Sequence, residues 1–85
     1  MVPGEYEVIR QVEQMLRCLN MLDEPGLSCG TAIESLLSAY HHWGIAQSIL
    51  PEGTSEHTKL RLAEASQLAT LAKVGVKARC LLRLR

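Results

Sequence analysis

The sequence predicts an all-α protein, a small antiparallel array of three to five helices. Apolar residues recur at helical spacing in three segments, and stretches containing Pro and Gly separate these segments. Phe is absent, Leu and Ala are common, and β-branched residues are too sparse for a sheet protein. With 85 residues the chain is expected to form one domain, residues 1–85, with residues 1–4 as a flexible leader.

The first helix is expected over residues 5–22. Its apolar residues recur at steps of four, three, four and three, which is the seam of one amphipathic helix. The seam consists of Val8, Val12, Met15, Leu19 and Leu22. Pro25 and Gly26 then end the helix, because Pro cannot continue it and Gly permits a turn.

The second helix is expected to begin at Thr31, which stands three residues before Glu34 in a capping box. One face of this helix carries Ile33, Leu36, Leu37, Tyr40 and Trp43. Two interpretations of Gly44 are possible. It can be an interior glycine, which destabilises the helix by ~1 kcal/mol relative to Ala, or it can end the helix and be followed by a short helical turn over residues 45–50.

The third helix is expected to begin at Thr54 or Ser55 and to reach at least Lys73. Gly75 is a second candidate break. Helix is favoured as far as Leu84, because one apolar register passes through Gly75 and places Ala78 and Leu81 on the buried side. That register consists of Leu71, Val74, Ala78 and Leu81.

Charge is zero overall but unevenly distributed. Residues 1–34 hold six acids and two bases, whereas residues 65–85 hold five bases and no acid. The basic end fits an acidic partner, a phosphate backbone or the dipole of a helix C-terminus. Nothing at the start reads as a signal peptide, and no run could span a bilayer. We therefore expect a cytoplasmic protein with reduced thiols, in which Cys18 and Cys80 act as small core hydrophobes.

No residue pattern predicts catalysis, a cofactor or a metal. His41 and His42 are adjacent and point about 100° apart on a helix, so they cannot both face one ligand. The spacings typical of zinc sites, nucleophile elbows and glycine-rich phosphate loops are absent from the sequence. We therefore expect a protein that is not an enzyme.

One alternative is a small helix-turn-helix transcriptional regulator. Residues 68–79 resemble the core of that DNA-binding motif, with a turn at Gly75 followed by a basic segment. The match is imperfect, because Ala72 precedes Gly75 by three positions instead of four, and Leu81 and Leu82 leave little polar surface for reading bases. A third option is a bundle that only associates with itself.

Residues 36–40, followed by Gly44, resemble the helix-turn-helix unit of tetratricopeptide repeats in degenerate form. Residues 8–16 resemble the first helix of the tetratricopeptide-like chaperones for the needle subunit of type III secretion systems. Residues 60–64, with the Leu/Ala-rich helix and basic end that follow, are similar to the C-terminal region of those chaperones.

This resemblance implies a cytoplasmic co-chaperone that keeps a needle subunit monomeric. It implies that a hydrophobic groove holds an amphipathic helix of the subunit and that a second small helical chaperone packs on another face. Partner binding is expected to involve residues on the apolar faces of the second and third helices. They are Leu36, Tyr40, Trp43, Leu68, Leu71, Val74, Ala78 and Leu81.

Overall fold

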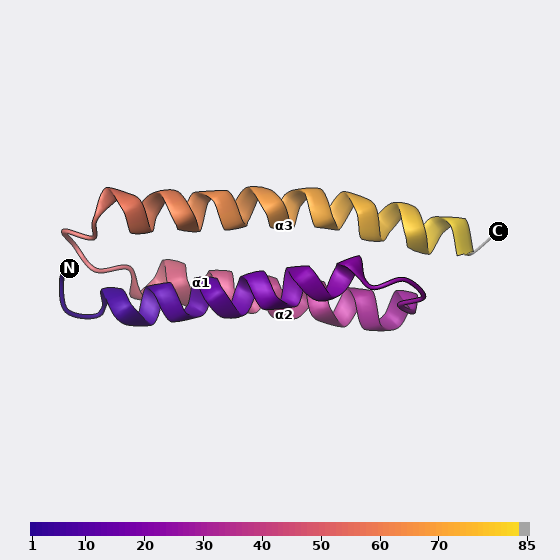
Figure 1. Ribbon diagram of the computed structural model, residues 1–85, viewed down its shortest axis with the longest axis horizontal. Coiled ribbons are helices and arrows are strands. Elements are labelled where there is room, and N and C mark those ends of the chain that lie inside the picture. Colours follow the sequence, from indigo (N-terminus) through magenta and orange to yellow (C-terminus); the bar gives the residue numbers. More distant parts are fainter. Residues whose placement is uncertain (84–85) are drawn as a thin grey trace.

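In the computed structural model, which describes residues 1–83, the chain forms three long helices, each antiparallel to the one before it (Figure 1). Helix α1 spans Glu5–Asn20, α2 spans Cys29–Ile49 and α3 spans Glu56–Arg83. Residues 1–83 contain no β-strand, and their array measures 50 × 19 × 16 Å. The predicted all-α helical array of three to five helices is confirmed, with three long helices.

Helix α1 buries the whole predicted seam. Val8, Val12, Met15, Leu19 and Leu22 are all in the core. The regular helix ends at Asn20, and a short 3₁₀ turn, η1 (Met21–Asp23), carries Leu22 into the core. The seam was readable from the sequence because α1 has one apolar face and one polar face.

The N-cap of α2 lies three residues earlier than predicted. Ser28 is the N-cap, and its hydroxyl accepts a hydrogen bond from the backbone N–H of Thr31 at 3.1 Å. The prediction that Thr31 caps the helix is therefore wrong, because Thr31 lies inside the first turn and supplies the donor that the cap satisfies.

Helix α2 also runs through Gly44 without a turn, so residues 36–44 form no helix-turn-helix unit. Gly44 does not have a positive φ angle. Its cost of ~1 kcal/mol relative to Ala is offset by the residues around it, since Ala46 is fully buried and Trp43 packs against the core.

Helix α3 runs through Gly75 to Arg83, and Leu84, the expected helix end, lies outside the described residues. The face that it buries differs from the predicted one. Its core residues are Leu62, Ala65, Ala69 and Val76, whereas Leu71, Val74, Ala78 and Leu81 are exposed.

The orientation of α3 about its own axis, which decides the face that it buries, has a physical cause at each end of the helix. Thr58 donates a hydrogen bond to Glu5 near the start of α3, and Cys80 is bonded to Cys29 near its end. Thr58 and Cys80 share a helix face with Leu62 and Val76, since their positions differ by multiples of the helical repeat. These two ties turn that face toward α1 and α2.

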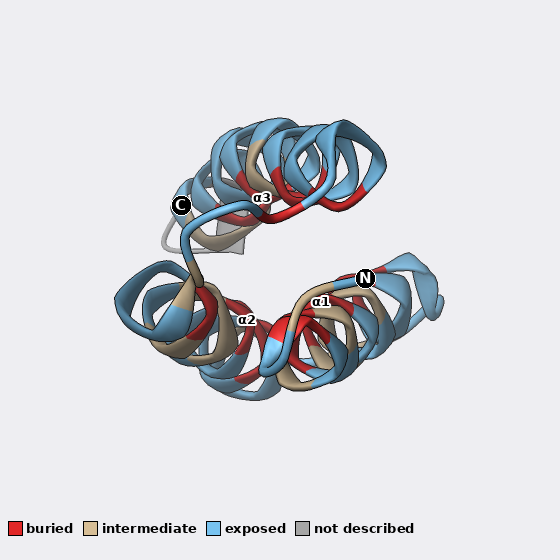
Figure 2. Cartoon of the chain, turned by 90° about the vertical axis from the view of Figure 1, so that its left-hand side faces the viewer, coloured by how far each residue is buried: buried red, intermediate tan, exposed pale blue. Residues whose placement is uncertain are grey.

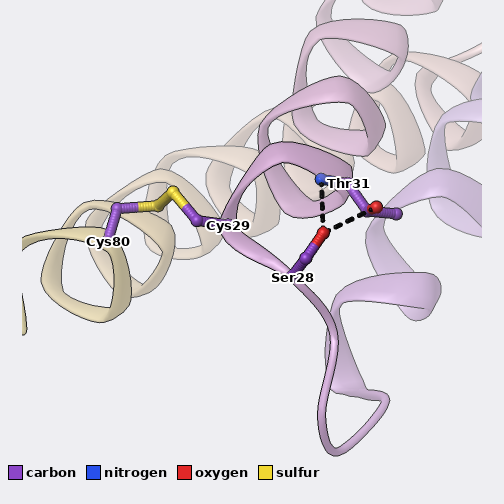
Figure 3. The surroundings of a disulfide bond; sticks show 4 residues. All are labelled: Ser28, Cys29, Thr31 and Cys80. Atoms are coloured by element: carbon purple, nitrogen blue, oxygen red, sulfur yellow. Dashed lines mark hydrogen bonds between the residues drawn. A yellow bond between two sulfur atoms is a disulfide. The ribbon is translucent and has the colours of Figure 1, made fainter. Parts of the chain in front are cut away.

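The expectation of reduced cysteines is wrong for two of the three. Cys29 and Cys80 form a disulfide, with an S–S distance of 2.08 Å and their Cα atoms 5.4 Å apart (Figure 3). Sequence spacing did not suggest this pair because 51 positions separate them. Cys18 is free and packs against the core, as predicted. Among the described residues, no helix combines the length and apolarity needed to cross a membrane.

Candidate protein-binding surface

The structure separates the predicted partner-binding residues into two groups. On α2, Leu36 belongs to the core, and Tyr40 and Trp43 are half-buried against it. On α3, the other five residues are exposed, and we call them the outer face of α3. They are Leu68, Leu71, Val74, Ala78 and Leu81. The two groups therefore do not form one continuous groove.

The outer face of α3 points away from the core. In the end-on view, the buried residues of α3 lie on the side toward α1 and α2, and the opposite side is exposed (Figure 2). Leu71 is 69% exposed and Val74 is 64% exposed. From Leu71 the spacing of three, four and three residues to Leu81 lines these side chains up along one stripe.

Basic residues flank this apolar stripe. Lys73 and Lys77 are exposed on one side of it. On the other side Arg79 is half-buried, and its guanidinium donates a 3.4 Å hydrogen bond to the carbonyl oxygen of Leu22. Residues 65–83 contain no acid, so the charged side chains that flank the stripe from Leu71 to Leu81 are basic. The basic end expected from the sequence thus lies beside an exposed apolar surface.

A concave surface lies between α2 and α3. It is a cavity of about 350 Å³ lined on the α2 side by Trp43, Gln47 and Leu50. The α3 side contributes Lys59, Leu62, Ala63 and Ser66. The indole N–H of Trp43 is buried and has no hydrogen-bond partner among the described residues. The sequence did not indicate this cavity, because its lining comes from two helices whose pairing depends on the tertiary structure.

The start of α3 is held by a carboxylate from α1. Glu5 is 1% exposed, and its side chain accepts hydrogen bonds from the Ser55 N–H and hydroxyl, both at 3.0 Å, and from the Thr58 hydroxyl at 2.8 Å. The Ser55 N–H, followed by the two hydroxyls, holds the pKa of Glu5 below its ordinary value, whereas burial acts in the opposite direction. Sequence reasoning counted Glu5 only as one acid of an acidic segment and missed this role.

The two adjacent histidines do not form a joint site. Their rings meet edge to face with centroids 5.7 Å apart. His42 Nδ1 lies 2.7 Å from Gln11 Oε1, and the amide of Gln11 also donates to Glu7 at 3.0 Å. This chain of contacts links α1 to α2. Within residues 1–83, no three His, Cys, Asp or Glu side chains are grouped so that they could hold a metal ion.

The helix-turn-helix alternative lacks its turn. Residues 68–79 lie inside α3, which is one continuous helix (Figure 1). A recognition helix of that motif needs a separate supporting helix before the turn. The structure therefore places the basic residues of this stretch along one long helix.

In comparisons with known proteins, no family model, curated protein or solved structure matches this chain.

Proposed function

We propose that this protein binds an amphipathic helix of another protein along the outer face of α3. The observation that carries the proposal is that α3 has two apolar faces on opposite sides, and the core covers only one. A surface helix of a globular protein ordinarily carries polar residues opposite its buried face. An apolar stripe with a heptad-like repeat is the surface that a second helix covers in helix-helix packing.

The charges around the stripe specify the kind of helix. Lys73, Lys77 and Arg79 surround it, and no acid lies between residues 65 and 83. A partner helix with an apolar seam and acidic flanks would satisfy both features. The apolar contact would supply most of the affinity, and the charge pairing would supply orientation and a faster association.

Within this class, we propose a needle-subunit co-chaperone of a type III secretion system. The resemblance of residues 8–16 and 60–64 to that family supports the assignment. The family holds a polymerising subunit through its amphipathic helix, and the outer face of α3 offers a surface for one. Binding would then take place in the cytoplasm before export. Exposed Ile33 and Leu37 on α2 offer a separate apolar contact for a second small chaperone.

The test measures binding of a purified needle subunit from the source organism, and of a peptide covering its C-terminal helix, by isothermal titration calorimetry. Leu71→Asp and Val74→Asp place a charge in the stripe. Both side chains are exposed, so we expect both variants to stay folded. We expect the affinity of each variant to be at least tenfold lower than that of the wild type, because burial of one aliphatic side chain contributes roughly 1.5–3 kcal/mol.

Ser38→Asp is the matched control, because it adds the same charge at an exposed position of α2. Its affinity should equal that of the wild type. Equal affinity of the wild type and the two stripe variants would overturn the outer face as the binding surface. Absence of needle-subunit binding, while a synthetic acidic amphipathic helix still binds the stripe, would overturn the needle assignment alone.

A further inference from the structure

The two ends of α3 are held to the rest of the molecule by different chemistry. At the start, the Glu5 carboxylate accepts hydrogen bonds from Ser55 and Thr58. Near the end, the Cys29–Cys80 disulfide joins α3 to the first residue of α2 (Figure 3). Reduction can break the second tie and leaves the first unaffected.

The C-terminal part of α3 has little else to hold it. Among residues 73–81, Val76 is buried, Arg79 and Cys80 are half-buried, and the others are exposed. The hydrogen bond from Arg79 to the Leu22 carbonyl is long at 3.4 Å. By contrast, the preceding half of α3 buries Thr58, Leu62, Ala65 and Ala69. Local opening free energies follow such differences in buried contacts, so the two halves should open independently.

We infer that the Cys29–Cys80 disulfide is a redox latch, whose reduction releases α3 from Val76 onward while the earlier turns stay docked. The reductant is a dithiol. One of its thiolates bonds to the sulfur of Cys80, and the sulfur of Cys29 leaves as a thiolate and takes up a proton. The mixed disulfide joins this first sulfur of the reductant to Cys80. The second thiol of the reductant then attacks the first sulfur, closes a disulfide within the reductant and releases Cys80 as a thiolate, which takes up a proton. Two electrons and two protons pass from the dithiol to the cysteine pair.

The surroundings of the latch favour this exchange. Cys29 and Cys80 are both half-buried, so each keeps surface that a reductant can reach. Cys29 is the first residue of α2, directly after the N-cap Ser28. The backbone N–H groups at a helix N-terminus stabilise negative charge, and they would stabilise the departing sulfur of Cys29.

The latch also controls part of the outer face of α3. Ala78 and Leu81 lie in the segment that is released, whereas Leu71 lies before it. The oxidised protein therefore presents the complete stripe in one geometry. The reduced protein must order the segment on binding, which lowers affinity. This consequence rests on the proposed function, whereas the latch itself does not.

Hydrogen-deuterium exchange of the full chain, free of any partner, tests the latch directly. The protein is compared in its oxidised state and after treatment with dithiothreitol. We expect exchange of amides after Val76 to accelerate on reduction at least tenfold more than exchange in residues 56–69 and in α1, which respond only to the lower global stability. Cys80→Ser and Cys29→Ser should show the fast pattern with or without reductant. Cys18→Ser keeps the pair and should respond like the wild type.

Equal exchange in the oxidised and reduced states would overturn the latch. Acceleration spread equally over all three helices would overturn it too, since the bond would then stabilise the whole fold and not the end of α3 in particular. A second arm measures the affinity for the needle-subunit helix in both states, where we expect at least severalfold weaker binding after reduction. A redox-dependent exchange pattern with no binding in either state would remove the proposed function and leave the latch standing.

Discussion

The carboxylate of Glu5 accepts a hydrogen bond from the hydroxyl of Thr58 at 2.8 Å, across 53 positions of sequence. Glu5 is the first residue of α1, and Thr58 lies in the first turn of α3. A buried carboxylate on α1 therefore acts at the start of another helix, where free N–H groups and the helix dipole favour negative charge. The same contact helps to decide which face of α3 enters the core.

The first prediction concerns acid. Because its hydrogen bonds hold the pKa of Glu5 below the ordinary value of 4.5, this residue stabilises the fold above that value. The contribution is lost as pH falls through the lower folded-state pKa. Urea denaturation of the wild type and of Glu5→Gln should show the variant less stable at pH 7, with the difference shrinking at pH values below 4.5.

Glu13→Gln is the control for this experiment, because Glu13 is an exposed carboxylate on the same helix. Its stability should follow that of the wild type across the pH range. A Glu5→Gln deficit that stays constant down to acid pH would show that ionisation of Glu5 does not matter.

The second prediction concerns the start of α2. Ser28→Ala should lower the free energy of unfolding by about 0.5–2 kcal/mol, because the N–H of Thr31 loses its acceptor. Thr31→Ala should cost less, since the backbone donor and the Ser28 hydroxyl both remain. Urea denaturation of the two variants gives the comparison. A larger loss of stability for Thr31→Ala than for Ser28→Ala would indicate that Thr31, and not Ser28, caps α2.

The third prediction tests the rotation of α3 with two leucines that are two positions apart. Leu62 is 3% exposed, and Leu60 is 58% exposed. Leu62→Ala should cost roughly 2–5 kcal/mol, because it opens a cavity in the core. Leu60→Ala should stay within about 0.5 kcal/mol of the wild type. Thermal and urea denaturation measure both, and similar losses for the two variants would contradict the face that α3 buries.

The fourth prediction concerns the stabilisation by the disulfide. Closing a loop whose ends are 51 positions apart restricts the unfolded chain, and in the chain-entropy account this contributes about 4 kcal/mol. Denaturation with and without dithiothreitol should show a loss of that order. Cys29→Ser and Cys80→Ser should match the reduced wild type, and Cys18→Ser should match the oxidised protein. Unequal behaviour of the two latch variants without reductant would indicate another pairing.

Helix α1 shows how far the sequence alone could go. Its seam was read correctly because the opposite side of the helix is polar, so only one rotation buries the apolar residues. Helix α3 could not be solved in this way. It has apolar residues on two opposite sides, and periodicity gives both the same weight.

The candidate site, too, was predicted only in part from the sequence. The sequence identified the apolar register from Leu71 to Leu81 and the basic residues around it, but it left open whether that register packs in the core or against a partner. Tertiary contacts turned it outward, through Glu5 at one end of α3 and Cys29 at the other.

The sequence by itself therefore determined the helical class, the number of long segments and the core face of α1. These depend on local propensity and on the spacing of residues within one helix. The cap at Ser28 also depends on local sequence. Thr31, three positions later, is another residue type that caps helices, so the sequence offered two candidates. The continuity of α3 through Gly75 was predicted from its apolar register. Only the tertiary structure decided the continuity of α2 through Gly44, the Cys29–Cys80 bond and the exposed face of α3. Each of these depends on contacts between helices, because packing can offset the cost of a glycine and can bring together residues that are far apart in sequence.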